Sequence, residues 1–159
     1  IKDCIVGLGF PDIVFQPEDA FVHLRDKLLK SKCDVVLGVV PYGEYLKSDM
    51  IEFGDDGKIS DIVIKQNRPD LKYGWFIALW RPSFTTYMYN YLDGFLRENP
   101  SGRINSQEGV LRELFVGDVI RSAISSGMDV DYVLFPEGNY IDLGTPEAIA
   151  NRYKSADKL

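Results

Sequence analysis

Residues 34 to 41 read DVVLGVVP, an apolar and mostly β-branched run that ends at a proline. Such a run is typical of a strand that is buried on both faces of a sheet. An earlier run, CIVGLG at 4 to 9, has the same character. Between the two runs, Pro17 and two acidic residues open a stretch with apolar residues at helical spacing, which reaches about Ser31. The order strand, helix, strand predicts a unit of a parallel sheet with a right-handed crossover.

The rest of the chain continues this alternation. Two short runs at 50–54 and 59–65 flank an Asp-Gly turn and predict a hairpin. Further strands are predicted at 75–80, 129–135 and 139–143, further helices at 82–96, at 117–125 and from Thr145 onward, and a polar loop at 97–109. The pattern as a whole predicts an α/β domain with a mixed, mostly parallel sheet and helices on both faces.

Composition limits the classes of function. A chain of 159 residues, of which 45% are hydrophobic and 26% charged, fits one globular domain, and it contains no apolar run of the length that spans a membrane. A net charge of -6 with scattered basic residues argues against binding to nucleic acid. Cys4 and Cys33 are far apart and His23 is the single histidine, which argues against a zinc site or a disulfide framework and favours a cytoplasmic location. The oligomeric state stays open, and a homo-oligomer is compatible with these properties.

Two aspartates follow predicted strands directly. Asp12 comes after the run at 4–9 and a Gly-Phe-Pro turn, and Asp142 ends the strand at 139–143. Ligands of open α/β sheets gather beyond the carboxyl ends of strands. If both strands end at one cleft, the two carboxylates could hold a hard divalent cation such as Mg²⁺. The alternative is structural: Asp12 as a turn residue and Asp142 as an acceptor for nearby backbone amides.

Lys65 and Gly74 are the other candidate site residues. Lys65 ends the strand at 59–65, where its ammonium could meet a phosphate as a point charge, or could simply lie in solvent. Gly74 precedes the strand at 75–80 and could let a ligand approach the backbone, or could close a turn.

Five stretches, taken in order, resemble the sugar nucleotidyltransferases, and in particular the glucose-1-phosphate thymidylyltransferases. They are GLGFPDIVFQPEDAF (7–21), CDVVLGVVP (33–41), DGKISDIVIK (56–65), YGWFIALWRPSF (73–84) and DYVLFPEGNYIDLGTPEAIANRY (131–153). The resemblance runs from Ile1 to about Tyr153, and its most specific piece is Asp-x-Gly-Thr-Pro-Glu at 142–147. It implies a Rossmann-like, GT-A-like fold.

The resemblance also implies roles for the candidate residues. Asp12 and Asp142 would bind the catalytic Mg²⁺, Lys65 would bind the sugar phosphate, and Gly74 would line the sugar pocket. The implied substrates are a nucleoside triphosphate and a sugar 1-phosphate, and the products are an NDP-sugar and pyrophosphate. The sequence departs from the family at two of these positions, with Phe-Pro-Asp-Ile in place of Gly-Asp-Asn and Ile-Lys-Gln in place of Glu-Lys-Pro.

Members of the family begin with a glycine-rich loop, Gly-x-Gly-x-Arg, that cradles the triphosphate. These 159 residues contain no such loop. We therefore expect residues 1–159 to be a single domain that is incomplete at the N-terminus, namely the carboxyl-terminal two-thirds of a catalytic domain that is inactive alone. The base and the sugar cannot be named from this sequence.

Two alternatives remain. The first is a non-catalytic homologue that binds sugar phosphates or acts as a regulatory subunit. The second is a glycosyltransferase that uses a nucleotide-sugar. Its Asp-x-Asp metal motif would have to be DVD at 129–131, which lies in a predicted strand whose side chains alternate between faces.

Overall fold

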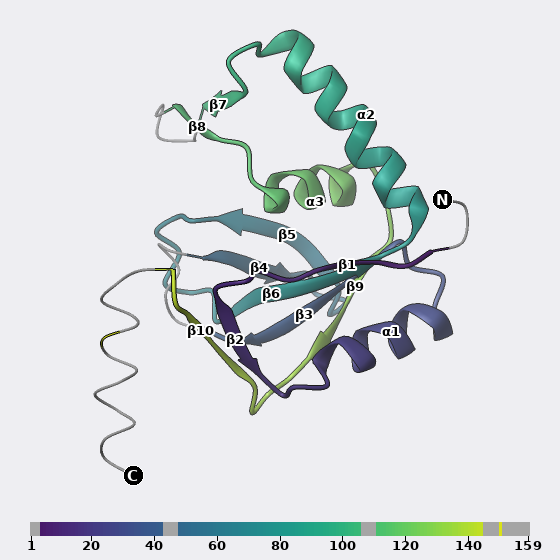
Figure 1. The fold of residues 1–159 in the computed structure, drawn as a ribbon, viewed down its shortest axis with the longest axis vertical. Coiled ribbons are helices and arrows are strands. Elements are labelled where there is room, and N and C mark those ends of the chain that lie inside the picture. Colours follow the sequence, from purple (N-terminus) through teal and green to yellow (C-terminus); the bar gives the residue numbers. More distant parts are fainter. Residues whose placement is uncertain (1–3, 43–47, 106–110, 145–149, 151–159) are drawn as a thin grey trace.

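The computed structural model describes residues 4–42, 48–105, 111–144 and 150. Its main sheet has the strand order β5-β4-β6-β3-β9, with the short strand β1 also paired to β6 (Figure 1). The strands of this sheet are β1 (Val6–Leu8), β3 (Val35–Pro41), β4 (Asp49–Phe53), β5 (Ile59–Ile64), β6 (Tyr73–Trp80) and β9 (Val130–Leu134). The helices of the described part are α1 (Ala20–Lys30), α2 (Pro82–Glu98) and α3 (Val116–Ser125).

The sheet is mostly antiparallel, so the prediction of a mostly parallel sheet is wrong. Within it only β3 and β9 pair in parallel, while β6 is antiparallel to β1, β3 and β4. The physical reason lies in the burial of the strands. Every residue of β6 from Gly74 to Trp80 is buried, and a strand covered on both faces has the same apolar pattern in either direction.

The expected relation between the first two predicted strands is only partly present. Val6 and Val35 both lie opposite Trp80 in β6, so β1 and β3 run in the same direction but on the two sides of β6. Helix α1 therefore connects two strands of equal direction with an antiparallel strand inserted between them. The sequence pattern does not show that another strand lies between these two.

The helices cover both faces of the sheet, as predicted. Helix α1 packs on one face, and α2 and α3 lie on the other (Figure 1). Alternate residues of β3 divide between the two layers: Val36 and Val40 pack in the cluster that contains Leu24 of α1, whereas Leu37 packs in the cluster that contains Ile120 of α3. This alternation follows from the two-residue period of a strand.

The predicted helices and the hairpin are present with small shifts at their ends. Helix α1 begins at Ala20 rather than at Pro17, and its fully buried Ala20, Leu24 and Leu28 follow the i, i+4 spacing of one helix face. Strands β4 and β5 form the predicted antiparallel hairpin, and Gly57 supplies the positive φ of its turn. Helix α2 has Pro82 at its first position, as expected.

Two short two-stranded ribbons were not predicted, although the strand at 139–143 that contributes to one of them was. Strands β7 (Arg103–Asn105) and β8 (Leu111–Glu113) pair within and just after the stretch at 97–109 that we expected to be a loop. Strands β2 (Ile13–Gln16) and β10 (Asn139–Asp142) pair with each other outside the main sheet. The helix predicted from Thr145 onward lies outside the described residues, apart from Ala150.

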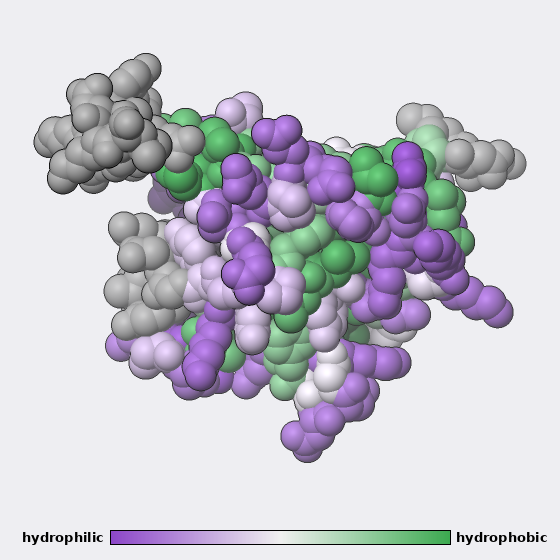
Figure 2. All heavy atoms as spheres, turned by 90° about the horizontal axis from the view of Figure 1, so that it is seen from below, coloured by the Kyte–Doolittle hydropathy of each residue, from purple (hydrophilic) through white to green (hydrophobic). Residues whose placement is uncertain are grey.

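The surface on the side of α1 is mainly hydrophilic. Figure 2 views the molecule from below and shows polar residues around a narrow apolar band. In the part of the chain that the structure describes, no helix is both long and apolar enough to cross a bilayer.

Candidate functional site

The ribbon of β2 and β10 brings Asp12 and Asp142 together. Its antiparallel register places Asp142 opposite Ile13, the residue that follows Asp12. The backbone continues the pairing one step further, because Leu143 N–H donates to the carbonyl of Asp12 at 2.7 Å. The two aspartates that sequence reasoning selected are therefore neighbours in space.

Gly144 lies between the two carboxylates. Its N–H donates to Asp142 Oδ1 at 2.7 Å. A Cβ placed on Gly144 would lie 2.8 Å from Asp12 Oδ2 and 2.9 Å from Asp142 Oδ1. The distance between these two oxygens therefore cannot exceed the sum of the two values. The carboxylates thus share a small space that is kept open by the absence of a side chain at Gly144.

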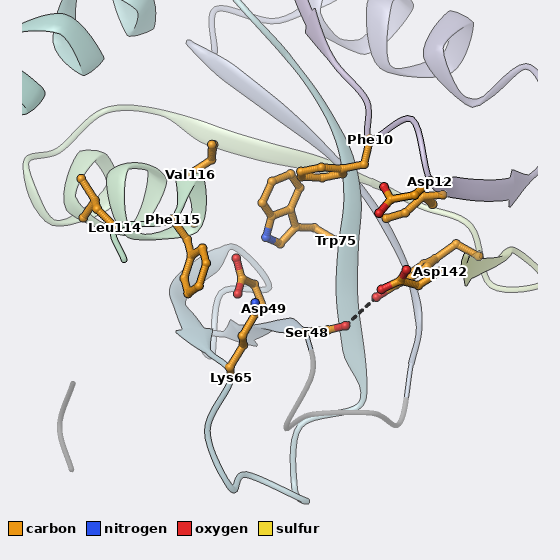
Figure 3. A pocket seen from close by; sticks show the side chains of 13 residues that line it. Phe10, Asp12, Ser48, Asp49, Lys65, Trp75, Leu114, Phe115, Val116 and Asp142 are labelled. Atoms are coloured by element: carbon orange, nitrogen blue, oxygen red, sulfur yellow. Dashed lines mark hydrogen bonds between the residues drawn. The ribbon is translucent and has the colours of Figure 1, made fainter. Parts of the chain in front are cut away.

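One pocket of about 370 Å³ contains both aspartates and Lys65. In Figure 3, Asp12 and Asp142 lie on one side of this pocket, Asp49, Lys65 and Phe115 lie on the other, and Phe10 and Trp75 lie between them. The pocket is lined by Phe10, Asp12, Ile13, Ser48, Asp49, Lys65, Trp75, Leu114, Phe115, Val116, Gly117, Tyr140 and Asp142. Asp12 and Asp142 therefore line the side of the pocket opposite Lys65, with aromatic side chains between them.

Lys65 has an unusual backbone conformation. It follows β5 with φ of 46°, in the left-handed region that non-glycine residues avoid at a cost of about 1–2 kcal/mol. Its N–H donates to the carbonyl of Ser48 at 3.3 Å, and its Nζ lies 4.0 Å from the centroid of the Phe115 ring. Contact with the face of an aromatic ring favours a cation. Strained conformations of this kind are frequent at functional sites.

Asp49 is the pocket residue that sequence reasoning missed. Burial raises the pKa of its carboxyl to about 6, and nearby Asp118 adds to the rise, whereas Lys65 and Arg112 oppose it. The indole N–H of Trp75 is directed at the carboxylate and also opposes the rise in its pKa. The two groups do not meet the geometry of a full hydrogen bond, and both Asp49 Oδ1 and Trp75 Nε1 are buried without another partner among the described residues. The only sequence signal was an acidic residue directly before the predicted run at 50–54, and the structure pairs it with Ile64.

The start of α3 forms one wall of the pocket and is fixed by an ion pair. Asp118 accepts two hydrogen bonds from Arg112, both at 2.6 Å, and a third from the N–H of the N-cap residue Phe115 at 2.9 Å. The Asp118 side chain is only 7% exposed. Because a buried carboxylate needs its donors, this network holds Leu114 to Gly117 in place against the pocket.

Tyr140 is a lining residue whose side chain is held in place by two contacts. Its hydroxyl is 2.8 Å from Ser48 Oγ, and its ring stacks on Tyr42 at 4.4 Å. Burial raises the pKa of Tyr140 above its usual range, so the hydroxyl stays protonated.

Gly74 is not among the lining residues. It is buried in β6, and a Cβ on it would lie 3.4 Å from Tyr42. Its neighbour Trp75 faces the pocket instead. The substrate-binding role expected for Gly74 stays a prediction.

The described residues contain no cluster of three or more His, Cys, Asp or Glu side chains that could hold a metal ion. Asp12 and Asp142 form a pair of neighbouring carboxylates, not a cluster of three. Mg²⁺ is commonly held by one or two carboxylates, with waters and substrate phosphates completing its coordination. The oxygen donors and the open space at Gly144 fit such an ion.

Comparison with known proteins gives a match in fold. No family model and no curated protein matches the sequence. A solved structure assigned as a glucose-1-phosphate thymidylyltransferase from Bacillus anthracis, in complex with sucrose, superposes with a TM-score of 0.66 and 15% identity over 98% of this chain. The inositol-1-phosphate CTP transferase from T. maritima superposes with a TM-score of 0.62 and 13% identity over 97% of it.

This chain spans 55% of the length of each of these two structures. Both neighbours are nucleotidyltransferases that act on sugar or inositol phosphates, in agreement with the resemblance found in the sequence motifs. The chain therefore has a mixed α/β nucleotidyltransferase fold, with a mostly antiparallel sheet.

Proposed function

We propose that the protein containing this chain transfers a nucleotidyl group from a nucleoside triphosphate to a sugar 1-phosphate. The observation that carries this proposal is that Asp12 and Asp142 line one side of a pocket whose other side is lined by Lys65. The fold match to two nucleotidyltransferases over nearly the whole chain supports it. Neither neighbour identifies the base or the sugar for this protein.

In the proposed reaction an oxygen of the sugar phosphate attacks the α-phosphorus of the triphosphate. A new P–O bond forms to the sugar phosphate as the bond between the α-phosphorus and the bridging oxygen breaks, and pyrophosphate leaves with the electron pair. Such a transfer depends mainly on positioning and on neutralising charge. Lys65 would bind and orient the attacking phosphate, and the apolar rings of Phe10 and Trp75 would exclude water from it.

Asp12 and Asp142 would hold Mg²⁺ in this proposal. The ion would supply positive charge against the phosphates of the substrates. Asp142 is oriented for this role by the N–H of Gly144, which occupies one lone pair of its Oδ1. In the same proposal Gly74 would keep the backbone beside Trp75 accessible to the sugar.

We infer that this chain supplies only part of the catalytic unit. It spans 55% of each matching structure, and no Gly-x-Gly-x-Arg sequence occurs in it. Residues 1–159 alone should therefore not release pyrophosphate. Turnover by the purified 159-residue chain with any pair of nucleoside triphosphate and sugar 1-phosphate would contradict this inference.

The test of the function is a pyrophosphate-release assay on the intact protein with a panel of nucleoside triphosphates and sugar 1-phosphates in the presence of Mg²⁺. Asp142→Asn keeps the hydrogen-bond acceptor for Gly144 but removes the charge, so turnover should fall by orders of magnitude while the fold persists. Asp70→Asn, at an exposed aspartate outside the pocket, is the matched control and should leave turnover unchanged. Near-normal turnover of Asp142→Asn at saturating Mg²⁺ would remove Asp142 from this role.

The same assay decides between the proposal and a non-catalytic homologue. Binding of sugar phosphate and nucleotide by the intact protein without release of pyrophosphate would favour a regulatory or sugar-phosphate-binding subunit. The glycosyltransferase alternative has little support from the site. Asp131 of the DVD stretch is paired with Lys27 at 2.7 Å, and neither Asp129 nor Asp131 is among the residues that line the pocket.

A cytoplasmic location remains part of the proposal. Cys4 and Cys33 are both free thiols, which suits a reducing compartment. A homo-oligomer remains open.

A further inference from the structure

Asp49 lines the pocket, and the indole N–H of Trp75 is the donor directed at its carboxylate, without the geometry of a full hydrogen bond. Asp49 Oδ1 is buried and has no hydrogen-bond partner among the described residues, and the same is true of Nε1 of Trp75. Trp75 is only 6% exposed. An unpaired polar atom in the interior costs about 1–3 kcal/mol. A ligand that supplied the missing partner would recover this free energy.

The carboxylate is held in place rather than free to turn away. A Cβ on Gly117, at the start of α3, would overlap Asp49 Oδ2, so the carboxylate packs directly against the backbone of that helix. The charged groups that face it are Lys65, Arg112 and Asp118, but none of the described basic side chains lies within the 4.0 Å of an ion pair with it. With a pKa of about 6, Asp49 is mostly ionised above neutral pH.

Asp49 lies beside the proposed phosphate-binding lysine. Asp49 pairs with Ile64 across the hairpin, and Lys65 is the next residue. Figure 3 places Asp49 and Lys65 on the same side of the pocket, away from Asp12 and Asp142. A group that binds to Asp49 while a phosphate binds to Lys65 must therefore be close to that phosphate in the substrate.

The donor and acceptor pattern favours a hydroxyl as this group. A carboxylate accepts hydrogen bonds only, and the indole N–H of Trp75 only donates. A hydroxyl can both donate to Asp49 and accept from Trp75, whereas an ammonium group can only donate. The surrounding rings of Phe10, Trp75 and Phe115 offer apolar faces of the kind that pack against a sugar ring.

Building on the proposed function, we propose that Asp49 is a specificity-determining residue whose carboxylate binds the hydroxyl on the carbon next to the phosphate-bearing carbon of the substrate. The site would thereby select sugar 1-phosphates that carry a 2-hydroxyl over their 2-deoxy analogues.

The experiment compares the calorimetric affinity of the intact protein for glucose 1-phosphate and for 2-deoxyglucose 1-phosphate at pH 8, where Asp49 is ionised. The wild-type protein should bind the deoxy compound about tenfold to a hundredfold more weakly, as expected for loss of a hydrogen bond to a charged group. Asp49→Ala should bind the two compounds with equal affinity. Asp70→Ala, at an exposed aspartate of the loop after β5, is the matched control and should keep the wild-type ratio.

Asp49→Asn provides a near-isosteric second variant in case the alanine variant does not fold. Its amide oxygen accepts a weaker hydrogen bond, so the ratio of affinities should fall to an intermediate value. A purely structural role for Asp49 would lower both affinities together and leave their ratio unchanged, which would overturn the proposal.

The failure of this proposal is distinguishable from failure of the proposed function. If neither compound binds, the assignment of Asp49 is overturned. If both bind but no pyrophosphate is released with any nucleoside triphosphate, the proposed function fails, and the ratio of affinities still decides the role of Asp49.

Discussion

Asp12 and Asp142 lie near opposite ends of the chain, yet Asp12 Oδ2 and Asp142 Oδ1 lie 2.8 Å and 2.9 Å from the position that a Cβ on Gly144 would occupy. The ribbon of β2 and β10 creates this contact, because it pairs the residues that adjoin the two aspartates. The relationship is the geometric basis of the proposed cation site. It also makes Gly144 the residue at which a single methyl group would disturb both carboxylates.

We predict that Gly144→Ala weakens Mg²⁺ binding without unfolding the protein. The added Cβ would meet the ends of two flexible side chains, at 2.8 Å from Asp12 Oδ2 and 2.9 Å from Asp142 Oδ1, so the carboxylates would move rather than the backbone. Displaced ligands of this kind typically lower metal affinity by about tenfold to a hundredfold. Titration calorimetry of Mg²⁺ into the intact protein measures the change.

Gly94→Ala is the control for this variant. A Cβ on Gly94 has nothing within 4 Å and lies in the interior of α2, so Mg²⁺ affinity should not change and the helix should gain up to about 1 kcal/mol. Equal Mg²⁺ affinities of Gly144→Ala and the wild-type protein would count against a cation between Asp12 and Asp142.

We predict that Asp49→Asn stabilises the protein in a pH-dependent manner. The carboxyl has a pKa of about 6 in the folded protein, against 3.8 without burial, so folding favours its protonated form. The ionised carboxylate therefore lowers the free energy of unfolding above pH 6, and this penalty disappears as the pH falls toward 4. At pH 8 the asparagine variant should be more stable by about 1–3 kcal/mol.

Urea denaturation at several pH values checks this prediction. The difference between the variant and the wild-type protein should shrink between pH 7 and pH 4. A difference that is constant over this range would show that the carboxyl of Asp49 titrates normally.

Much of the fold could be predicted from local patterns. The β4–β5 hairpin, the helices α1, α2 and α3, and the strands β3, β6 and β9 all follow from apolar periodicity and from turn residues such as Gly57. The direction of the strands could not be predicted in this way. A run such as β6 is apolar at every position because both of its faces are covered, and that pattern is the same in parallel and antiparallel sheets.

Only some of the site residues could be predicted from local sequence patterns. Asp12, Lys65 and Asp142 were found because each stands at the end of a predicted strand, and the structure brings all three to one pocket. The unpredicted strand β2 is short and lies between two prolines, so turn signals masked the element that joins the two aspartates. Asp49 could not be found because its burial depends on the start of α3, which is distant in the sequence.

We predict that Arg112→Met destabilises the protein strongly. It would leave the 7% exposed carboxylate of Asp118 with only the N–H of Phe115 as a donor. Removing one partner of a buried ion pair costs about 3–5 kcal/mol, and the partial exposure of Arg112 should place the loss at the lower end. Chemical denaturation measures the loss.

Arg68→Met tests whether this loss is specific to the buried pair. Arg68 bonds to Asp70 and Glu52 at the surface, where an ion pair contributes at most about 1 kcal/mol. Equal losses of stability in the two variants would contradict the structural role of the Arg112–Asp118 pair at the start of α3.

We predict that Lys65→Gly separates stability from binding. Glycine adopts the φ of 46° at this position without strain, but it also increases the entropy of the unfolded chain, so the net change in the free energy of unfolding should stay within about 1 kcal/mol. Alanine retains the strain, and Lys65→Ala should therefore be less stable than Lys65→Gly by about 1 kcal/mol.

Both variants lack the ammonium group, so both should bind glucose 1-phosphate about tenfold to a hundredfold more weakly than the wild-type protein. Lys58→Gly, at an exposed lysine just before β5, removes the same charge outside the pocket and should leave this affinity unchanged. Calorimetric titration and thermal unfolding of the four proteins together check the prediction. Wild-type affinity in Lys65→Gly would exclude Lys65 as the phosphate ligand, because this variant has no ammonium group to bind the phosphate.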